Sequence, residues 1–336
     1  MEHLNFYEWN MNGCINSKMI GRVLGVLLLI EMGMLLLCGG ISFCYGENDY
    51  IYFLYTCGVN VVAGILLLLY GRGAENKMNR RDGYCVVSLS WLFFTIFGML
   101  PFYLSGSVDT IANAFFETMS GFTTTGATIL DDIESLSHGM LFWRSLTQWI
   151  GGLGIVFFTI AILPIFTSGG VQLFSAESTG VIHNRTHPKI NVMAKWLWAV
   201  YLILTLLETI LLMFGGMNLF DAICHSFTTT ATGGYSTKQA SISYWNSPFI
   251  EYVVSVFMLL SSMNFALFLM CLKGKVGKIF KDEEVRWFLG SVAILTGMIT
   301  IALVFHNHYD WELAFRKSLF QVTTVHTSCG FATDDY

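Results

Sequence analysis

The sequence predicts an all-α polytopic membrane protein built from repeated units of membrane helix, pore helix and membrane helix. Of its 336 residues, 54% are hydrophobic and 12% are charged, whereas soluble domains average about 45–50% and about 25%. The apolar residues form blocks of twenty or more, the length that a helix needs to cross a bilayer. These observations exclude a soluble globule, and the net charge of −5 leaves no basic surface for nucleic acid.

Seven blocks are long and apolar enough to be membrane spans, so most of the chain is expected to contact membrane lipid. They cover residues 19–43, 50–71, 84–105, 139–166, 193–215, 250–272 and 287–305. Fourteen of the eighteen Lys and Arg residues fall in segments on the side of the N-terminus, and cytoplasmic segments retain such residues. We therefore expect a multi-pass protein of the cell (inner or plasma) membrane with a cytoplasmic N-terminus.

Three segments on the opposite side are too short and too interrupted to cross the membrane: 109–130, 217–237 and 313–333. Each begins with a helix-like stretch of ten to twelve residues and continues into a Thr- and Gly-rich turn. Non-helical backbone at membrane depth is tolerated only inside protein or beside a watery cavity, so we expect re-entrant loops.

The spans and loops divide the chain into four parts. They are an N-terminal cytoplasmic segment with two extra membrane helices (1–83), a first pore unit (84–167), a cytoplasmic loop with a second pore unit (168–272), and an incomplete third pore unit (273–336).

An internal repeat aligns the three re-entrant segments on Gly126, Gly234 and Gly330. Polar residues recur thirteen and nine positions before each glycine, and Ser or Thr recurs six positions before it. These positions hold Asn113, Asp221 and Lys317; Glu117, His225 and Gln321; and Ser120, Thr228 and Thr324. In the second copy Gly233 is an alternative to Gly234, although the polar positions agree better with Gly234.

This pattern is typical of a cation filter. The C-terminal end of a short helix presents carbonyl groups and the negative end of its dipole to a cation. A following Thr/Gly backbone can replace hydration water with oxygen ligands, and glycine permits the positive φ that this turn needs. The alternative is that small and hydroxylated residues only allow close helix packing, which three copies on one side disfavour.

The repeat also predicts what the chain lacks. Its glycines lie about a hundred residues apart, and six residues follow Gly330. We expect the third unit to lack its second span and a fourth unit to be absent, so that about two and a half units of a pseudo-fourfold pore are present. Three walls would leave a dehydrated cation under-coordinated, so we expect no cation uptake by this chain alone.

Five strings resemble the Trk/Ktr/HKT family of potassium transporters, in particular its TrkH-type branch. They are SGFTTTGAT (120–128), FWRSLTQWIGGLGI (142–155), GGVQLFSAESTG (169–180), LFDAICHSFTTTATGGYST (219–237) and HTSCGFATDDY (326–336). The resemblance implies four units around one potassium pathway, a homodimer, and a cytosolic nucleotide-binding regulatory subunit of the TrkA type.

The same resemblance implies which residues form the potassium filter. They are Thr124, Thr125 and Gly126; Thr232, Gly233 and Gly234; and Ser328, Cys329 and Gly330. Cys329 stands where the family commonly has Thr, so a carbonyl ligand is expected there in place of a side-chain oxygen.

Together these features predict potassium uptake across the cytoplasmic membrane, either channel-like or coupled to H⁺ or Na⁺. We expect no covalently bound cofactor, with K⁺ as the transported ion. An enzyme is not expected, because the HExxH and GxSxG motifs are missing. The alternative is a truncated, non-conducting or regulatory membrane subunit.

Arg144, Glu31 and Glu208 are ionisable residues inside expected spans. Arg144 lies near the outer end of its span, where its side chain can reach the interface, and we expect Glu117 or a backbone carbonyl as its partner. Glu31 and Glu208 lie outside the filter segments. For them a protonated or hydrogen-bonded helix contact is favoured over a role in proton or cation coupling.

The charge distribution generates a topology prediction. A cysteine placed at Ser135 should react with a membrane-impermeant thiol reagent added outside the cell, and one at Asn76 should not. Labelling of Asn76 with protection of Ser135 would reverse the predicted orientation.

Overall fold

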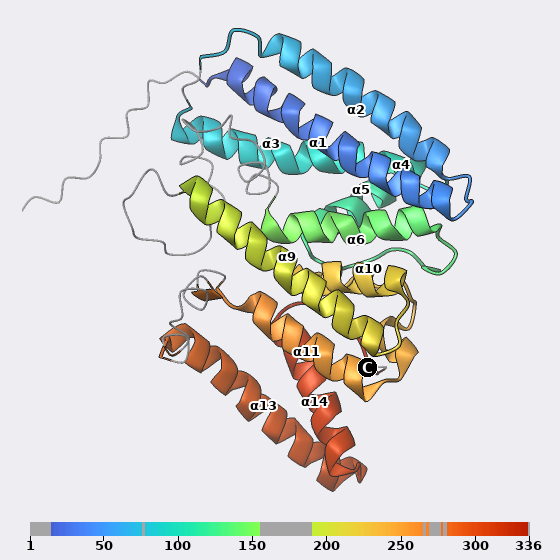
Figure 1. The fold of residues 1–336 in the computed structure, drawn as a ribbon, viewed down its shortest axis with the longest axis vertical. Helices are drawn as coiled ribbons and strands as arrows, with labels where there is room; N and C mark the ends of the chain where they lie inside the picture. The colour runs from blue at the N-terminus through green and yellow to red at the C-terminus, as the bar shows by residue number, and fades with distance from the viewer. Residues whose placement is uncertain are drawn as a thin grey trace, which may run out of the picture.

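The computed structural model describes residues 15–75, 78–154, 190–264, 267–268, 277 and 281–334. These residues are mostly helical, and the described ranges contain no strand. Figure 1 shows long helices that lie across the molecule, with short helices between them. The predicted all-α polytopic class is confirmed.

Helices α1 (Ser17–Cys44) and α2 (Tyr50–Tyr70) form an antiparallel pair at one end of the molecule (Figure 1). Glycines bring the two helices together, because a Cβ on Gly25 would lie 2.8 Å from the carbonyl oxygen of Gly64. Small residues of this kind allow the close van der Waals packing that holds helices together in lipid.

The described part of the first pore unit contains four helices. They are α3 (Arg80–Gly98), α4 (Leu100–Leu104), the pore helix α5 (Ile111–Phe122) and α6 (His138–Leu153). Thr110 begins α5 by accepting a hydrogen bond from the Asn113 amide at 3.1 Å, the preferred chemistry of an N-cap. The ring of Phe122 packs edge-on against Phe94 and Trp143, so the pore helix is fixed between α3 and α6.

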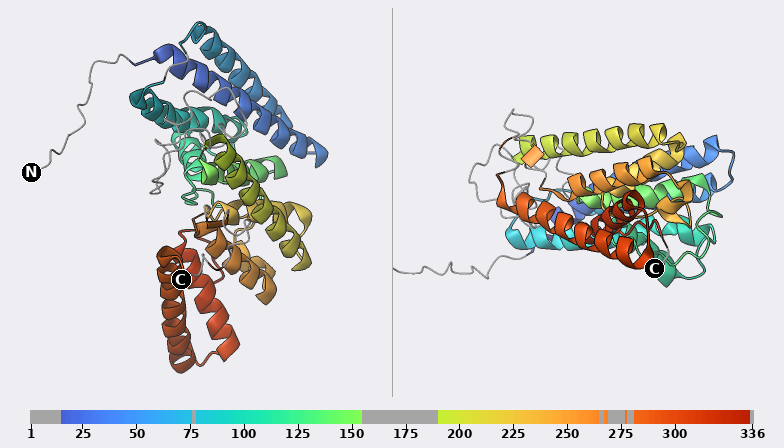
Figure 2. Two further views of the ribbon diagram at one scale, coloured as in Figure 1. Left: turned by 60° about the vertical axis from the view of Figure 1, so that its left-hand side comes forward. Right: turned by 90° about the horizontal axis from the view of Figure 1, so that it is seen from below.

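The rest of the described chain forms the second and third units. It contains α9 (Ile190–Phe214), the pore helix α10 (Leu219–Thr230), the 3₁₀ helix η3 (Ser241–Trp245), α11 (Pro248–Ser262), α13 (Glu283–Asn307) and the pore helix α14 (Trp311–His326). The α13–α14 hairpin lies at the end of the molecule opposite α1 and α2 (Figure 2).

Among the described residues, five helical segments are long and apolar enough to cross a membrane, and they correspond to five of the seven expected spans. They are Ser17–Cys44, Tyr50–Tyr70, Arg81–Leu104, Lys195–Phe214 and Glu283–Asn307. The sixth expected span, 250–272, is described as the 15-residue apolar helix α11. Residues 265–266 and 269–272 of that span lie outside the described ranges.

An uninterrupted helix over the expected span 139–166 is not formed. Helix α6 has 16 residues and ends at Leu153, before Gly154 with φ of 78°. Sixteen residues rise about 24 Å, less than the roughly 30 Å hydrocarbon core. Residues 155–166 lie outside the described ranges.

The three pore helices have 12, 12 and 16 residues, so the third is longer than the expected ten to twelve. Its extra turn carries Glu312, which pairs with Arg316 one turn later at 3.0 Å. An i,i+4 ion pair and an acidic residue near the N-terminus both stabilise a helical turn, which accounts for the earlier start.

Candidate cation filter

Each pore helix ends four residues before its repeat glycine, and each ends with the same hydrogen bond. The amide of the residue one position before the glycine donates to the carbonyl of the residue six positions before the glycine. These bonds run from Thr125 to Ser120, from Gly233 to Thr228 and from Cys329 to Thr324, at 2.8–2.9 Å. A bond of this span closes a helix in a Schellman turn. The sequence repeat is therefore also a repeat of backbone geometry.

The backbone is left-handed two positions before each glycine. Thr124, Thr232 and Ser328 have φ of 54°, 51° and 53°. Helices commonly end with glycine in this conformation, and a non-glycine residue there costs about 1–3 kcal/mol. The surrounding structure must therefore hold the three turns in place.

The left-handed glycines settle the register of the second copy. Gly234 has φ of 76°, as Gly126 does, and Gly330 has φ of 88°. Gly233 does not have a positive φ, and its amide makes the helix-closing bond. Gly234 is therefore the structural equivalent of Gly126 and Gly330.

The three loops converge, and the first two glycines each pack against a carbonyl of a neighbouring loop. A Cβ on Gly126 would overlap the carbonyl oxygen of Gly233 and lie 3.6 Å from that of Cys329. A Cβ on Gly234 would overlap the same Cys329 oxygen. At Gly330 no described atom lies within 4 Å of the equivalent position. The contacts thus run from the first loop to the second and from the second to the third.

The predicted ligands differ in exposure. The side chain of Cys329 is fully buried, whereas Ser328 and Gly330 are exposed. The carbonyl of Cys329 lies against Gly234, so the backbone of this residue faces the neighbouring loop. This placement agrees with the expectation of a carbonyl group at this position.

Polar side chains nine positions before each glycine brace the chain that follows the filter. The Thr128 hydroxyl donates to Glu117 at 3.0 Å. His225 Nε2 lies 2.9 Å from Ser236 Oγ, and Gln321 Nε2 donates to Thr333 Oγ1 at 3.3 Å. The polar repeat position therefore ties each pore helix to the segment two or three residues beyond its glycine.

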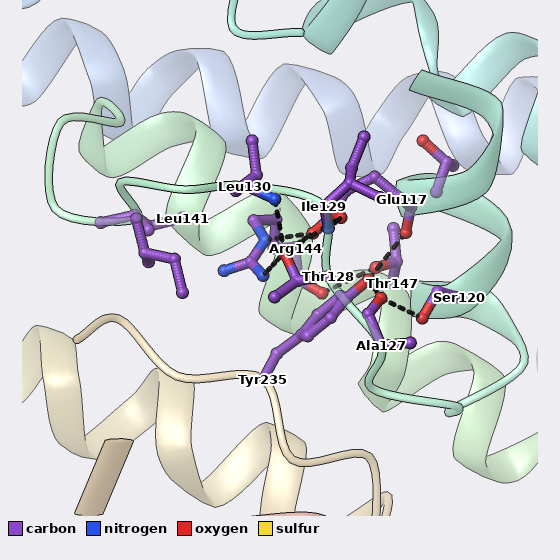
Figure 3. Close-up of polar contacts among 12 residues, drawn as sticks. Glu117, Ser120, Ala127, Thr128, Ile129, Leu130, Leu141, Arg144, Thr147 and Tyr235 are labelled. Atoms are coloured by element: carbon purple, nitrogen blue, oxygen red, sulfur yellow. Dashed lines mark hydrogen bonds and ion pairs between the residues drawn. The ribbon is translucent and has the colours of Figure 1, made fainter. Parts of the chain in front are cut away.

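Arg144 of α6 joins the first loop to the second (Figure 3). Its Nε donates to Glu117 Oε1 at 2.9 Å, with both side chains at most 2% exposed. Its Nη1 donates to the Ser236 carbonyl and its Nη2 to Thr128 Oγ1, each at 3.2 Å, and its guanidinium lies 4.1 Å from the ring centre of Tyr235. The predicted partners are confirmed, but the predicted reach to the interface is wrong, because Glu117 and the carbonyl satisfy the cation inside the protein.

Gln148, one helical turn after Arg144, clamps the second loop. Its Nε2 donates to the Gly233 carbonyl at 2.8 Å, and its Oε1 accepts from the Tyr235 amide at 3.1 Å. A side chain on Gly233 would overlap this amide. Gln148 lies within the FWRSLTQWIGGLGI string but is not singled out by the repeat. Its spacing of four from Arg144 indicates that both side chains lie on one helix face, toward the loops.

The third loop is anchored from α11. Glu251 Oε2 pairs with Arg316 at 2.8 Å, and Glu251 is 2% exposed. The neighbouring Lys317 donates to the Thr333 carbonyl at 2.6 Å. A buried ion pair thus fixes the pore helix α14, and Lys317 fixes the segment beyond its glycine.

A cavity of about 490 Å³ lies beside the segment that follows the first loop. Its acidic lining residues are Asp49, Asp109, Asp131 and Asp132. None of the predicted filter residues lines this cavity, so it is separate from the convergence of the loops.

The Arg144–Glu117 pair generates a stability prediction. Arg144→Met should cost about 3–5 kcal/mol of unfolding free energy, because Glu117 would remain buried without a partner. Lys238→Met is the control: its pair with Glu134 spans 3.5 Å, Glu134 is 43% exposed, and such pairs contribute about 0–1 kcal/mol. Unfolding curves in detergent measure both, and equal losses would contradict the central role of the pair.

Comparison with known proteins identifies the family. The TrkH family, described as cation transport proteins, matches residues 56–336. The Trk system potassium uptake protein TrkH of Salmonella typhimurium is 40% identical over 324 residues, covering 95% of this chain and 67% of that protein. Its counterpart in Escherichia coli K12 is 39% identical over the same shares.

A solved structure shares the fold. The crystal structure of the potassium transporter TrkH from Vibrio parahaemolyticus matches with a TM-score of 0.84 and 32% identity, over 94% of this chain and 66% of that one. This chain therefore spans about two thirds of the length of these relatives. The matched family, the relatives and the shared fold agree: the chain belongs to the TrkH family of cation transport proteins.

Proposed function

We propose that this chain takes part in potassium uptake across the cell membrane and contributes three walls of the ion pathway. The observation that carries the proposal is the convergence of three loops that end in the same left-handed turn, each after a pore helix. The names of the relatives, potassium uptake proteins of the Trk system, support K⁺ as the ion.

The chemistry follows from the backbone. Each pore helix directs its C-terminal end, which carries partial negative charge, toward the loops. A cation that enters among the loops exchanges hydration water for carbonyl and hydroxyl oxygens, and both cavity size and ligand field can select K⁺ over Na⁺. We assign this role to Thr124, Thr125 and Gly126 in the first loop, Thr232, Gly233 and Gly234 in the second, and Ser328, Cys329 and Gly330 in the third.

We also propose the membrane orientation of the protein, its unit boundaries and its partners. Basic residues on one side support a cytoplasmic N-terminus, and the unit boundaries at 84, 168 and 273 place one filter loop in each unit. The family resemblance supports a homodimer and a cytosolic nucleotide-binding subunit of the TrkA type. The basic run at 273–284, most of which lies outside the described residues, is the docking surface that we propose for that subunit.

Growth at limiting potassium tests the function. Cells without their own uptake systems would express this chain, or an extended chain joined after Tyr336 to the part of the Salmonella relative beyond the matched region. We expect growth with the extended chain and not with this chain alone, because a fourth wall completes the coordination. If neither grows although both reach the membrane, potassium uptake is the wrong function; growth with this chain alone would remove the need for a fourth wall.

Selectivity tests the filter residues. In the extended chain, Gly126→Ser and Gly234→Ser should each lower the K⁺/Na⁺ uptake ratio about tenfold, equivalent to about 1.4 kcal/mol, because the new Cβ overlaps a neighbouring carbonyl oxygen. Gly290→Ser in α13 is the control, since its Cβ meets nothing within 4 Å among the described atoms. Isotope uptake into vesicles measures the ratio, and an unchanged ratio in both filter variants would reject the assignment.

A further inference from the structure

Glu208 is a fully buried carboxyl group behind the second filter loop. It lies in α9, with 0% of its surface exposed. Its Oε2 is 3.5 Å from the hydroxyl of Thr230, the last residue of the pore helix α10. The left-handed Thr232 follows two residues later. Glu208 therefore contacts the point from which the second filter loop departs.

The hydroxyl hydrogens of the two α10 threonines beside Glu208 are already used. Thr230 Oγ1 donates to the Ser226 carbonyl at 2.7 Å, and Thr229 Oγ1 donates to the His225 carbonyl at 2.7 Å. A threonine hydroxyl has one hydrogen to donate. The contact between Thr230 and Glu208 is therefore a full hydrogen bond only when the carboxyl group carries the proton and donates it.

Electrostatics also favour the protonated form of Glu208. None of the ion pairs found in the described part of the chain includes Glu208, and a buried charge without a partner costs several kcal/mol. A carboxylate here would also face the negative C-terminal end of α10. The neutral acid avoids both costs and still supplies a donor.

We propose that Glu208 is a positioning residue for the second filter loop and that it acts in its proton-bearing form, as a hydrogen-bond donor to Thr230. Its Oε1 makes no hydrogen bond to a described residue, and its Oε2 contacts Thr230 at the end of the pore helix. The inference rests on the proposed function, because the position of the loop affects selectivity only if cations pass it.

Paired variants test the donor. Glu208→Gln keeps a donor of similar length and should hold the K⁺/Na⁺ uptake ratio within about twofold of the parent, whereas Glu208→Leu should lower it about threefold to tenfold, the effect of one hydrogen bond. Glu31→Leu is the control: Glu31 is also fully buried, and its carboxyl oxygens bond no described residue. The ratio is measured in whichever of the chain and the extended chain transports potassium.

An infrared measurement separates this inference from the proposed function. The band of a protonated carboxylic acid should be weaker in Glu208→Gln than in the parent chain at neutral pH, whether or not the protein transports potassium. No change in that band, or a ratio that falls as far in Glu208→Gln as in Glu208→Leu, would overturn the proposal. Absence of potassium uptake by both this chain and the extended chain would count against the proposed function alone.

Discussion

The structure depends on hydrogen-bond partners for the non-helical backbone groups that lie at membrane depth. Three loops leave the helical hydrogen-bond pattern where little water is available to replace it. Schellman bonds close the helix ends, polar side chains of the pore helices hold the descending segments, and Arg144 and Gln148 of α6 bond the second loop directly. The close approach of α6 needs its glycines, because a Cβ on Gly151 would overlap the Phe122 carbonyl. The motif around Arg144 is therefore a support for two loops at once.

Four buried glutamates of this protein fall into two classes, with and without an arginine partner. Glu117 and Glu251 each meet an arginine at 2.8–2.9 Å and hold a loop or a pore helix. Glu31 and Glu208 meet no cation in the described structure, and for such groups the neutral form is the inexpensive one. The paired carboxylates stand on the side of the segments that follow the filter, whereas Glu208 stands at the end of a pore helix. The charged carboxylates Glu117 and Glu251 thus brace the loops. Glu208 is neutral, so it does not change the electrostatic potential beside the second filter loop.

Most of the features of the candidate site that could be predicted from the sequence came from the internal repeat. Polarity nine positions before each glycine located the braces, and the match at Asp221 and His225 favoured Gly234, which the backbone supports. Other features depended on distant contacts. The span of α6 stops at Gly154, and Arg144, whose partner Glu117 was predicted, is buried inside the protein, which no local window reveals. Gln148 and the carbonyl-to-glycine contacts between loops were not predicted, because they join residues more than eighty positions apart.

The central claim is that the converging loops form a cation site when a fourth wall is present, and anomalous diffraction from crystals of the extended chain grown with thallium(I) tests it most directly. Thallium(I) has the charge of K⁺ and scatters strongly enough to be located. The account predicts an anomalous peak among the loops, beside the carbonyl oxygens of Gly233 and Cys329. Absence of that peak, with thallium bound only in the acidic cavity lined by Asp109 and Asp131, would contradict it.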